Sequence, residues 1–223
     1  MDFARLQTQL RTTLPMARIE PLPLPGCPEI RLGLINADFP EGPLPEEVMR
    51  AVIERPAYWA FCWGSGLALA RFLLDSPDWV RNRSVLDLGS GSGVVAIAAA
   101  LAGARRVVAC DNDPMALQAT AANAAANGVK LDLSDDLEQA GAAGPYDLLL
   151  MADVLYDRSN LGLLQQAARH ARAVLVADSR VRTLPTPGYR EIAVIEALTV
   201  PNLGEFDEFG TVRLFYLPNA PAP

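Results

Sequence analysis

The stretch from Ser84 to Val94 reads S-V-L-D-L-G-S-G-S-G-V, and the rest of the chain is organised around it. A short apolar run breaks at Gly89, Gly91 and Gly93 and then passes into V-V-A-I-A-A-A-L-A, which is rich in helix formers. This order predicts a strand, a glycine turn and a helix. Glycines let the backbone approach a ligand closely, and a helix N-terminus offers unpaired N–H groups to polar or anionic groups. The stretch therefore predicts a nucleotide-type binding site.

A second marker is the carboxylate that ends the next apolar run. Arg106 to Cys110 leads into Asp111, about twenty residues after the glycines, where a carboxylate can hold the two hydroxyls of a ribose. Val94 stands where a dinucleotide fingerprint needs its third glycine, which disfavours an NAD-linked oxidoreductase. Asp87, just ahead of the turn, would repel a pyrophosphate but attract a sulfonium and an ammonium group. We therefore expect S-adenosylmethionine as the cofactor.

Composition narrows the class of protein. The chain has 223 residues, of which 51% are hydrophobic, enough for one large domain with an extension. The net charge of -7 argues against a nucleic-acid partner, because phosphate binding needs a basic face. Three scattered cysteines and a single histidine predict free thiols, a reducing cytoplasmic location and no metal site. No apolar run approaches the roughly twenty residues of a bilayer span, so we expect a soluble protein that does not bind a membrane.

The first part of the chain reads as a small extension over residues 1–55. Leucines at helical spacing after Phe3 predict a helix over the first fourteen residues. Five prolines from Pro15 to Pro28 predict an extended, partly polyproline segment. Residues 29–34 alternate like a short strand, and a helix is expected after Pro45. A second, larger domain that holds the binding site is expected over residues 56–218.

The second part alternates strands and helices. A Gly64-Ser65-Gly66 turn is expected before a helix that begins at Leu67. Trp63, beside this turn, is placed to wall a ligand, whereas Trp59 could be either a wall residue or a core residue. Near-continuous apolar strands joined by crossovers imply a parallel sheet covered on both faces. The predicted strands are 84–89, 106–110, 129–133, 146–152, 173–178, 190–197 and 211–217, and the predicted helices are 92–102, 114–127 and 159–172.

The fourth of these strands carries the best catalytic candidates, Asp153 and Tyr156. Ligands of open parallel sheets bind beyond the carboxyl ends of the strands, so Asp153 should face the same crevice as Asp111. A lysine acceptor must lose a proton before it attacks, and a carboxylate or phenol can orient the amine. The alternative for Asp153 is to cap the following helix. After the third strand, Ser134, Asp135 or Asp136 could meet an adenine edge, or the three could form a solvated loop.

The motifs V-L-D-L-G-S-G-S-G, A-C-D-N-D-P and A-D-V-L-Y-D resemble those of the seven-β-strand class I methyltransferases. The stretch P-A-Y-W-A-F-C-W-G-S-G-L-A-L-A-R-F-L-L-D-S-P looks like that of the lysine methyltransferases acting on the electron-transfer flavoprotein β-subunit, although Gly64-Ser65 replaces the Pro-Gly or similar pair that usually follows their tryptophan. The resemblance covers residues 56 to 217. It implies an α/β, Rossmann-like sheet of order 3-2-1-4-5-7-6 with the last strand antiparallel.

We accordingly predict an S-adenosylmethionine-dependent methyltransferase that modifies a lysine of a protein substrate. Ribosomal-protein methyltransferases share the first motif but usually carry asparagine where Asp153 stands. The residues also leave open a small-molecule N-methyltransferase and a non-catalytic module that only binds the donor. The predicted donor contacts are Trp63, Asp87, Gly89, Ser90, Gly91, Asp111, Asn112, Asp135 and Ala152, with Asp153 and Tyr156 beside the target lysine.

Overall fold

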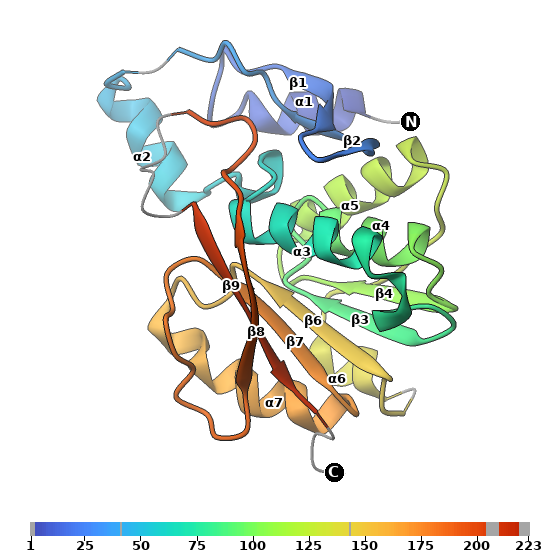
Figure 1. Cartoon of the computed structure of the whole chain (residues 1–223). Coiled ribbons are helices and arrows are strands. Elements are labelled where there is room, and N and C mark those ends of the chain that lie inside the picture. Colours follow the sequence, from blue (N-terminus) through green and yellow to red (C-terminus); the bar gives the residue numbers. More distant parts are fainter. Residues whose placement is uncertain (1–2, 41, 143, 204–209, 219–223) are drawn as a thin grey trace.

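The computed structural model describes residues 3–40, 42–142, 144–203 and 210–218, and a seven-stranded sheet forms its centre (Figure 1). The strands are β3 (Ser84–Leu88), β4 (Arg106–Cys110), β5 (Asp132–Ser134), β6 (Leu148–Ala152), β7 (Val174–Asp178), β8 (Arg190–Glu196) and β9 (Thr211–Leu217). Their order is β5-β4-β3-β6-β7-β9-β8, with β9 antiparallel to both of its neighbours and the other pairs parallel. The predicted fold, strand order and antiparallel last strand are confirmed.

Helices cover both faces of the sheet (Figure 1). One face packs against α3 (Gly64–Asp75), α4 (Val94–Leu101) and α5 (Pro114–Ala126), and the other against α6 (Leu137–Gly141) and α7 (Leu163–His170). Successive strand residues point to opposite faces, so Val85 joins the first core and Leu86 the second. Because both faces are covered, the open place for a ligand is the edge where the parallel strands end. Three 3₁₀ turns complete this part: η1 (Tyr58–Ala60), η2 (Pro77–Trp79) and η3 (Arg158–Gly162).

The N-terminal part differs from the expectation in its proline-rich segment. It contains α1 (Phe3–Leu10), β1 (Ile19–Leu24), β2 (Cys27–Ile35) and α2 (Glu46–Glu54). Pro21 and Pro23 lie in β1, which pairs antiparallel with β2 rather than forming a free polyproline segment. The pairing is possible because an edge strand tolerates residues that cannot donate a backbone hydrogen bond. Side chains of β2 share a core with α3 and α4, so the N-terminal part packs against the second part. The division of the chain into residues 1–55 and 56–218 stays a prediction.

The predicted Gly64-Ser65-Gly66 turn is wrong, because these residues form the first turn of α3. A Cβ on Gly64 would lie 2.8 Å from the carbonyl oxygen of Ala197, so glycine lets the segment after β8 pass close to the helix. Among the described helices, none is both long and apolar enough to cross a membrane.

Candidate active site

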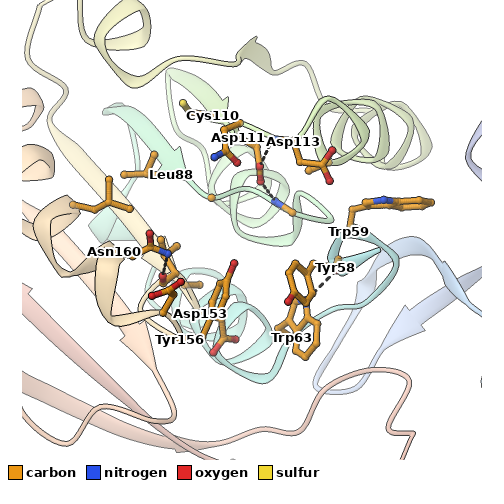
Figure 2. Close-up of a pocket in the computed structure, with 18 of the residues that line it drawn as sticks. Tyr58, Trp59, Trp63, Leu88, Cys110, Asp111, Asp113, Asp153, Tyr156 and Asn160 are labelled. Carbon is orange, nitrogen blue, oxygen red and sulfur yellow. Dashed lines mark hydrogen bonds between the residues drawn. The ribbon is translucent and has the colours of Figure 1, made fainter. Parts of the chain in front are cut away.

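A cavity of about 680 Å³ opens at the carboxyl ends of β3, β4 and β6 (Figure 2). This volume lies within the range of roughly 300–1,000 Å³ that small-molecule sites occupy. Nine of the eleven predicted site residues line it: Trp63, Gly89, Gly91, Asp111, Asn112, Asp135, Ala152, Asp153 and Tyr156. The structure therefore brings together residues that are up to 93 positions apart in the sequence, from Trp63 to Tyr156.

The two remaining predicted residues, Asp87 and Ser90, do not line the cavity. Asp87 is buried behind the glycine turn, where its carboxylate accepts a hydrogen bond from the backbone N–H of Ala96 at 3.0 Å. Burial raises the pKa of Asp87 to about 7. The Ser90 hydroxyl lies 3.2 Å from the hydroxyl of Thr120. Both side chains contact the helices behind the turn. Direct contact of Asp87 and Ser90 with the donor stays a prediction.

The glycine turn has a left-handed backbone at all three glycines, with φ of +78° at Gly89, +53° at Gly91 and +83° at Gly93. A Cβ on Gly89 would lie 2.7 Å from Val154, and one on Gly93 would lie 2.9 Å from Thr120. At Gly91 a Cβ would meet nothing within 4 Å, although the residue lines the cavity. Gly89 and Gly93 thus allow close packing, whereas Gly91 leaves space beside the backbone for a ligand.

Asp111 connects the end of β4 to the glycine turn. Its two carboxylate oxygens accept hydrogen bonds from the backbone N–H groups of Gly91 at 2.8 Å and Asp113 at 3.0 Å (Figure 2). Burial raises the pKa of Asp111, and the two backbone N–H groups act in the opposite direction. Each carboxylate oxygen has a further lone pair, so Asp111 can also accept bonds from ligand hydroxyls.

The loop after β5 contributes two neighbouring carboxylates with different surroundings. Asp136 is the N-cap of α6, where its side chain accepts a hydrogen bond from the backbone N–H of Gln139 at 2.7 Å. Asp135 is exposed at the cavity wall. The cap occupies one oxygen of Asp136, which makes Asp135 the better candidate for a contact with a ligand.

Asp153 follows β6 with a positive φ of 52°, a conformation that aspartate adopts more readily than most residues. Its two oxygens accept hydrogen bonds from the hydroxyl of Ser65 at 2.5 Å and from the backbone N–H of Ser65 at 2.9 Å. The alternative role as a cap of the following helix is wrong, because Asp157 caps η3 through the N–H of Ser159 at 2.8 Å. Burial is the main cause that raises the pKa of Asp153 to about 6.

Aromatic side chains form the other side of the cavity (Figure 2). The ring of Tyr58 lies 5.8 Å from that of Trp63 and 5.7 Å from that of Tyr156, measured between centroids. The indole N–H of Trp63 donates to the carbonyl oxygen of Tyr58 at 3.0 Å. Trp59 lines the cavity but is only 4% exposed. It also packs in a third core with side chains of α1 and β2, so it is both a wall residue and a core residue. Sequence analysis missed Tyr58, although it lies in the same aromatic run.

A second missed group comes from β7, the neighbour of β6. Buried Asp178 accepts hydrogen bonds from the backbone N–H groups of Arg180 and Val181, both at 2.8 Å, and its negative charge helps to raise the pKa of Asp153. Arg180 lines the cavity and acts on this pKa in the opposite direction. The pairing of β6 with β7 brings these groups to the site. The sequence carried a signal for Asp178, because it ends the predicted strand 173–178, which the predicted strand order places beside strand 146–152.

The wall of the cavity is strongly acidic. Six of the described residues that line it are aspartates and one is an arginine: Asp111, Asp113, Asp135, Asp136, Asp153, Asp157 and Arg180. A cleft lined by one sign of charge concentrates ligands of the opposite sign. The site is therefore suited to cationic groups and unsuited to phosphates.

Comparison with protein families matches residues 69–170 to the model of the ribosomal protein L11 methyltransferase, PrmA. Two curated relatives, both electron transfer flavoprotein beta subunit lysine methyltransferases, are similar to this chain. The one from Xenopus laevis is 42% identical over 127 residues, or 54% of this chain and 52% of the relative. The one from Rattus norvegicus is 45% identical over 102 residues, or 45% of this chain and 40% of the relative. The matches thus span about half the length of these relatives.

Among solved structures, the ribosomal protein L11 methylase from Lactobacillus delbrueckii subsp. bulgaricus superposes with a TM-score of 0.51. It shares 23% sequence identity, and the match covers 66% of this chain and 76% of that one. At this identity the likeness concerns the fold. Together with the strand order, it shows the seven-stranded fold of the class I methyltransferases, and residues 69–170 of this fold are similar to the PrmA family model.

Proposed function

We propose that this protein transfers a methyl group from S-adenosylmethionine to a lysine side chain of a protein substrate. The observation that carries this proposal is that Asp111 and Asp153 wall one cavity on either side of the glycine turn of β3. Strand β3 lies between β4 and β6, so one carboxylate is available to each end of a ligand laid across the three strands. The two lysine methyltransferase relatives support the same chemistry.

The residues of the cavity fit the proposed cofactor. Gly91 leaves space for it, Asp111 has lone pairs for ribose hydroxyls, and exposed Asp135 is placed for an adenine edge. Trp63 offers an aromatic face, and the acidic wall suits a positively charged molecule. When bound, S-adenosylmethionine supplies a methyl group on a cationic sulfonium, which is already a strong electrophile.

The task left to the protein is to position and deprotonate the acceptor. A free lysine has a pKa of about 10.4, so its amine must lose a proton before it can attack. The Asp153 carboxylate and the Tyr156 phenol can accept hydrogen bonds from the amine and orient it. The rings of Tyr58, Trp63 and Tyr156 can cover the entering side chain, favour a cationic group and keep water out.

For the substrate, we propose the β-subunit of an electron-transfer flavoprotein, on the strength of the two relatives. The acidic cavity favours a basic side chain over a nucleic acid. We also propose a cytoplasmic location, because Cys27, Cys62 and Cys110 are buried free thiols, as is usual in a reducing compartment.

The test is a methylation assay with purified protein, isotope-labelled S-adenosylmethionine and two separate substrates, electron-transfer flavoprotein and ribosomal protein L11. We expect label on a lysine of the flavoprotein β-subunit, located by mass spectrometry, and none with Asp153→Asn. Label on L11 alone would overturn the proposed substrate. Label on neither protein, in an assay where the donor binds, would overturn protein methylation.

A further inference from the structure

The first turn of α3 holds Asp153 through a single residue, Ser65. Ser65 is fully buried, and its hydroxyl and backbone N–H reach different oxygens of the same carboxylate, at 2.5 Å and 2.9 Å. Two donors on two oxygens fix the plane of a carboxylate, which one donor cannot do. The N–H also belongs to the unpaired groups at the start of a helix, where the helix dipole favours a negative charge.

We infer that Ser65 is a positioning residue for the proposed methyl transfer: it orients the Asp153 carboxylate toward the cavity and stabilises its charged form. The inference rests on the proposed function for its catalytic meaning, but the contact itself does not. Ser65 is flanked by Gly64 and Gly66, which have no side chains to replace its hydroxyl. A chain with the Pro-Gly pair at positions 64 and 65 would lack this hydroxyl bond.

The surroundings of Asp153 explain why such a donor is needed. The buried carboxylate of Asp178 repels a second negative charge nearby, and Cys62 from the segment before α3 is neutral because burial raises its thiol pKa well above the ordinary value. Arg180 favours the charged form of Asp153. Tyr156 is also neutral at physiological pH, since the ordinary pKa of a phenol is about 10 and desolvation raises the pKa of Tyr156 further. Burial and Asp178 thus oppose ionisation of Asp153, whereas Ser65 and Arg180 support it, which leaves its pKa at about 6.

The inference predicts the effect of Ser65→Ala, which removes the hydroxyl and keeps the backbone N–H. A lost hydrogen bond to a charged group should raise the pKa of Asp153 by about one pH unit. The matched control is Ser84→Ala. Ser84 also donates its hydroxyl and N–H to a carboxylate, that of Asp147, but it lies at the amino end of β3, away from the cavity.

The first measurement needs neither cofactor nor substrate. Carbon-13 NMR of aspartate-labelled protein follows the carboxyl groups through a pH titration, and Asp153→Asn identifies the signal. We expect Asp153 to titrate near pH 6 in the wild type and the Ser84→Ala control, and near pH 7 in Ser65→Ala. Ser65→Thr, which keeps the hydroxyl, should return the titration toward pH 6. An Asp153 signal that titrates at the wild-type pH in Ser65→Ala would overturn the inference.

The second measurement is the pH dependence of methyl transfer by the same variants. The acid limb of the rate profile should move upward by about one pH unit in Ser65→Ala and stay in place in Ser84→Ala. A titration that shifts while the rate profile does not would show that Ser65 has no role in the reaction. A titration that shifts in a protein that methylates no lysine would leave the contact standing and remove the proposed function instead.

Discussion

A serine donates hydrogen bonds to an aspartate at each end of the central sheet, but the pKa values of the two aspartates shift in opposite directions. At the amino end, Ser84 donates its backbone N–H and its hydroxyl to one oxygen of Asp147, both at 2.9 Å, whereas Ser65 reaches both oxygens of Asp153. At the carboxyl end, Ser65 donates the same two groups to Asp153. The Ser84 N–H holds the pKa of Asp147 below its ordinary value, whereas burial raises the pKa of Asp153 to about 6. Identical donors therefore do not decide the charge of a carboxylate.

The difference lies in water and in the neighbouring charges. The side chain of Asp147 is 30% exposed and lies 3.7 Å from the guanidinium of Arg105. Asp153 lies against the cavity wall beside buried Asp178. A carboxylate beside a cation stabilises the fold, whereas a partly buried one beside another carboxylate costs stability and has a raised pKa. The amino end of the sheet thus carries a carboxylate that stabilises the fold, and the carboxyl end carries the carboxylate that we propose acts in methyl transfer.

The largest expected effect is on activity. Asp153→Asn should lower the rate of lysine methylation at least about 100-fold, because the amide cannot orient and deprotonate the acceptor amine as a carboxylate does. Asp147→Asn should change the rate less than twofold. The assay is initial-rate label transfer at saturating donor, with calorimetric titration of S-adenosylhomocysteine to show that Asp153→Asn still binds. Equal losses from both substitutions would remove the functional distinction between the two ends.

The next effect is on stability, and its sign differs between the two pairs. The folded state of the wild type retains a proton on Asp153 up to about pH 6, well above the unfolded pKa, so stability is lost as pH rises through this window. Relative to that of the wild type, the free energy of unfolding of Asp153→Asn should therefore rise by about 2 kcal/mol from pH 4.5 to pH 7.5. The folded state lowers the pKa of Asp147, so the ionised carboxylate stabilises the protein at neutral pH, and this stabilisation is lost as pH falls below the unfolded pKa. Asp147→Asn should therefore lower the free energy of unfolding at pH 7.5.

Urea unfolding at the two pH values measures both changes. The buried carboxylate of Asp87 also titrates with a raised pKa, but it is common to wild type and variants and cancels in the difference. A stability difference between Asp153→Asn and the wild type that is the same at pH 4.5 and pH 7.5 would contradict the raised pKa of Asp153.

The smallest effect compares two glycines, one at the cavity and one away from it. Gly91 lines the cavity, whereas Gly128 follows the carboxyl end of α5. Both residues have a positive φ, +53° at Gly91 and +68° at Gly128, and a Cβ on either would meet nothing within 4 Å. Alanine should therefore cost each about 1 kcal/mol of stability through the left-handed backbone. Only Gly91→Ala should also weaken the binding of S-adenosylhomocysteine, raising its Kd, measured by calorimetry, by about tenfold. Unchanged affinity in both variants would mean that the space beside Gly91 does not hold the cofactor.

The sequence by itself determined the framework and much of the site. Short apolar runs, the glycines after β3, and Asp113 before Pro114 fixed where β3, β4 and α5 begin or end, because these signals are local. Asp111 and Asp153 could be predicted to share a crevice because the carboxyl ends of parallel strands meet at one edge. The predicted strand 129–133 is displaced to β5 at Asp132–Ser134, and α6 was not predicted, since short elements carry little periodicity.

Only the tertiary structure decided which groups surround those carboxylates. Ser65 and Asp153 are 88 residues apart, and the pairing of β6 with β7 places Asp178 beside them. Strand alternation and local turns are encoded within a few residues, whereas desolvation and charge contacts depend on every element that packs around a side chain. For that reason the position of Asp153 could be read from the sequence and its protonation could not.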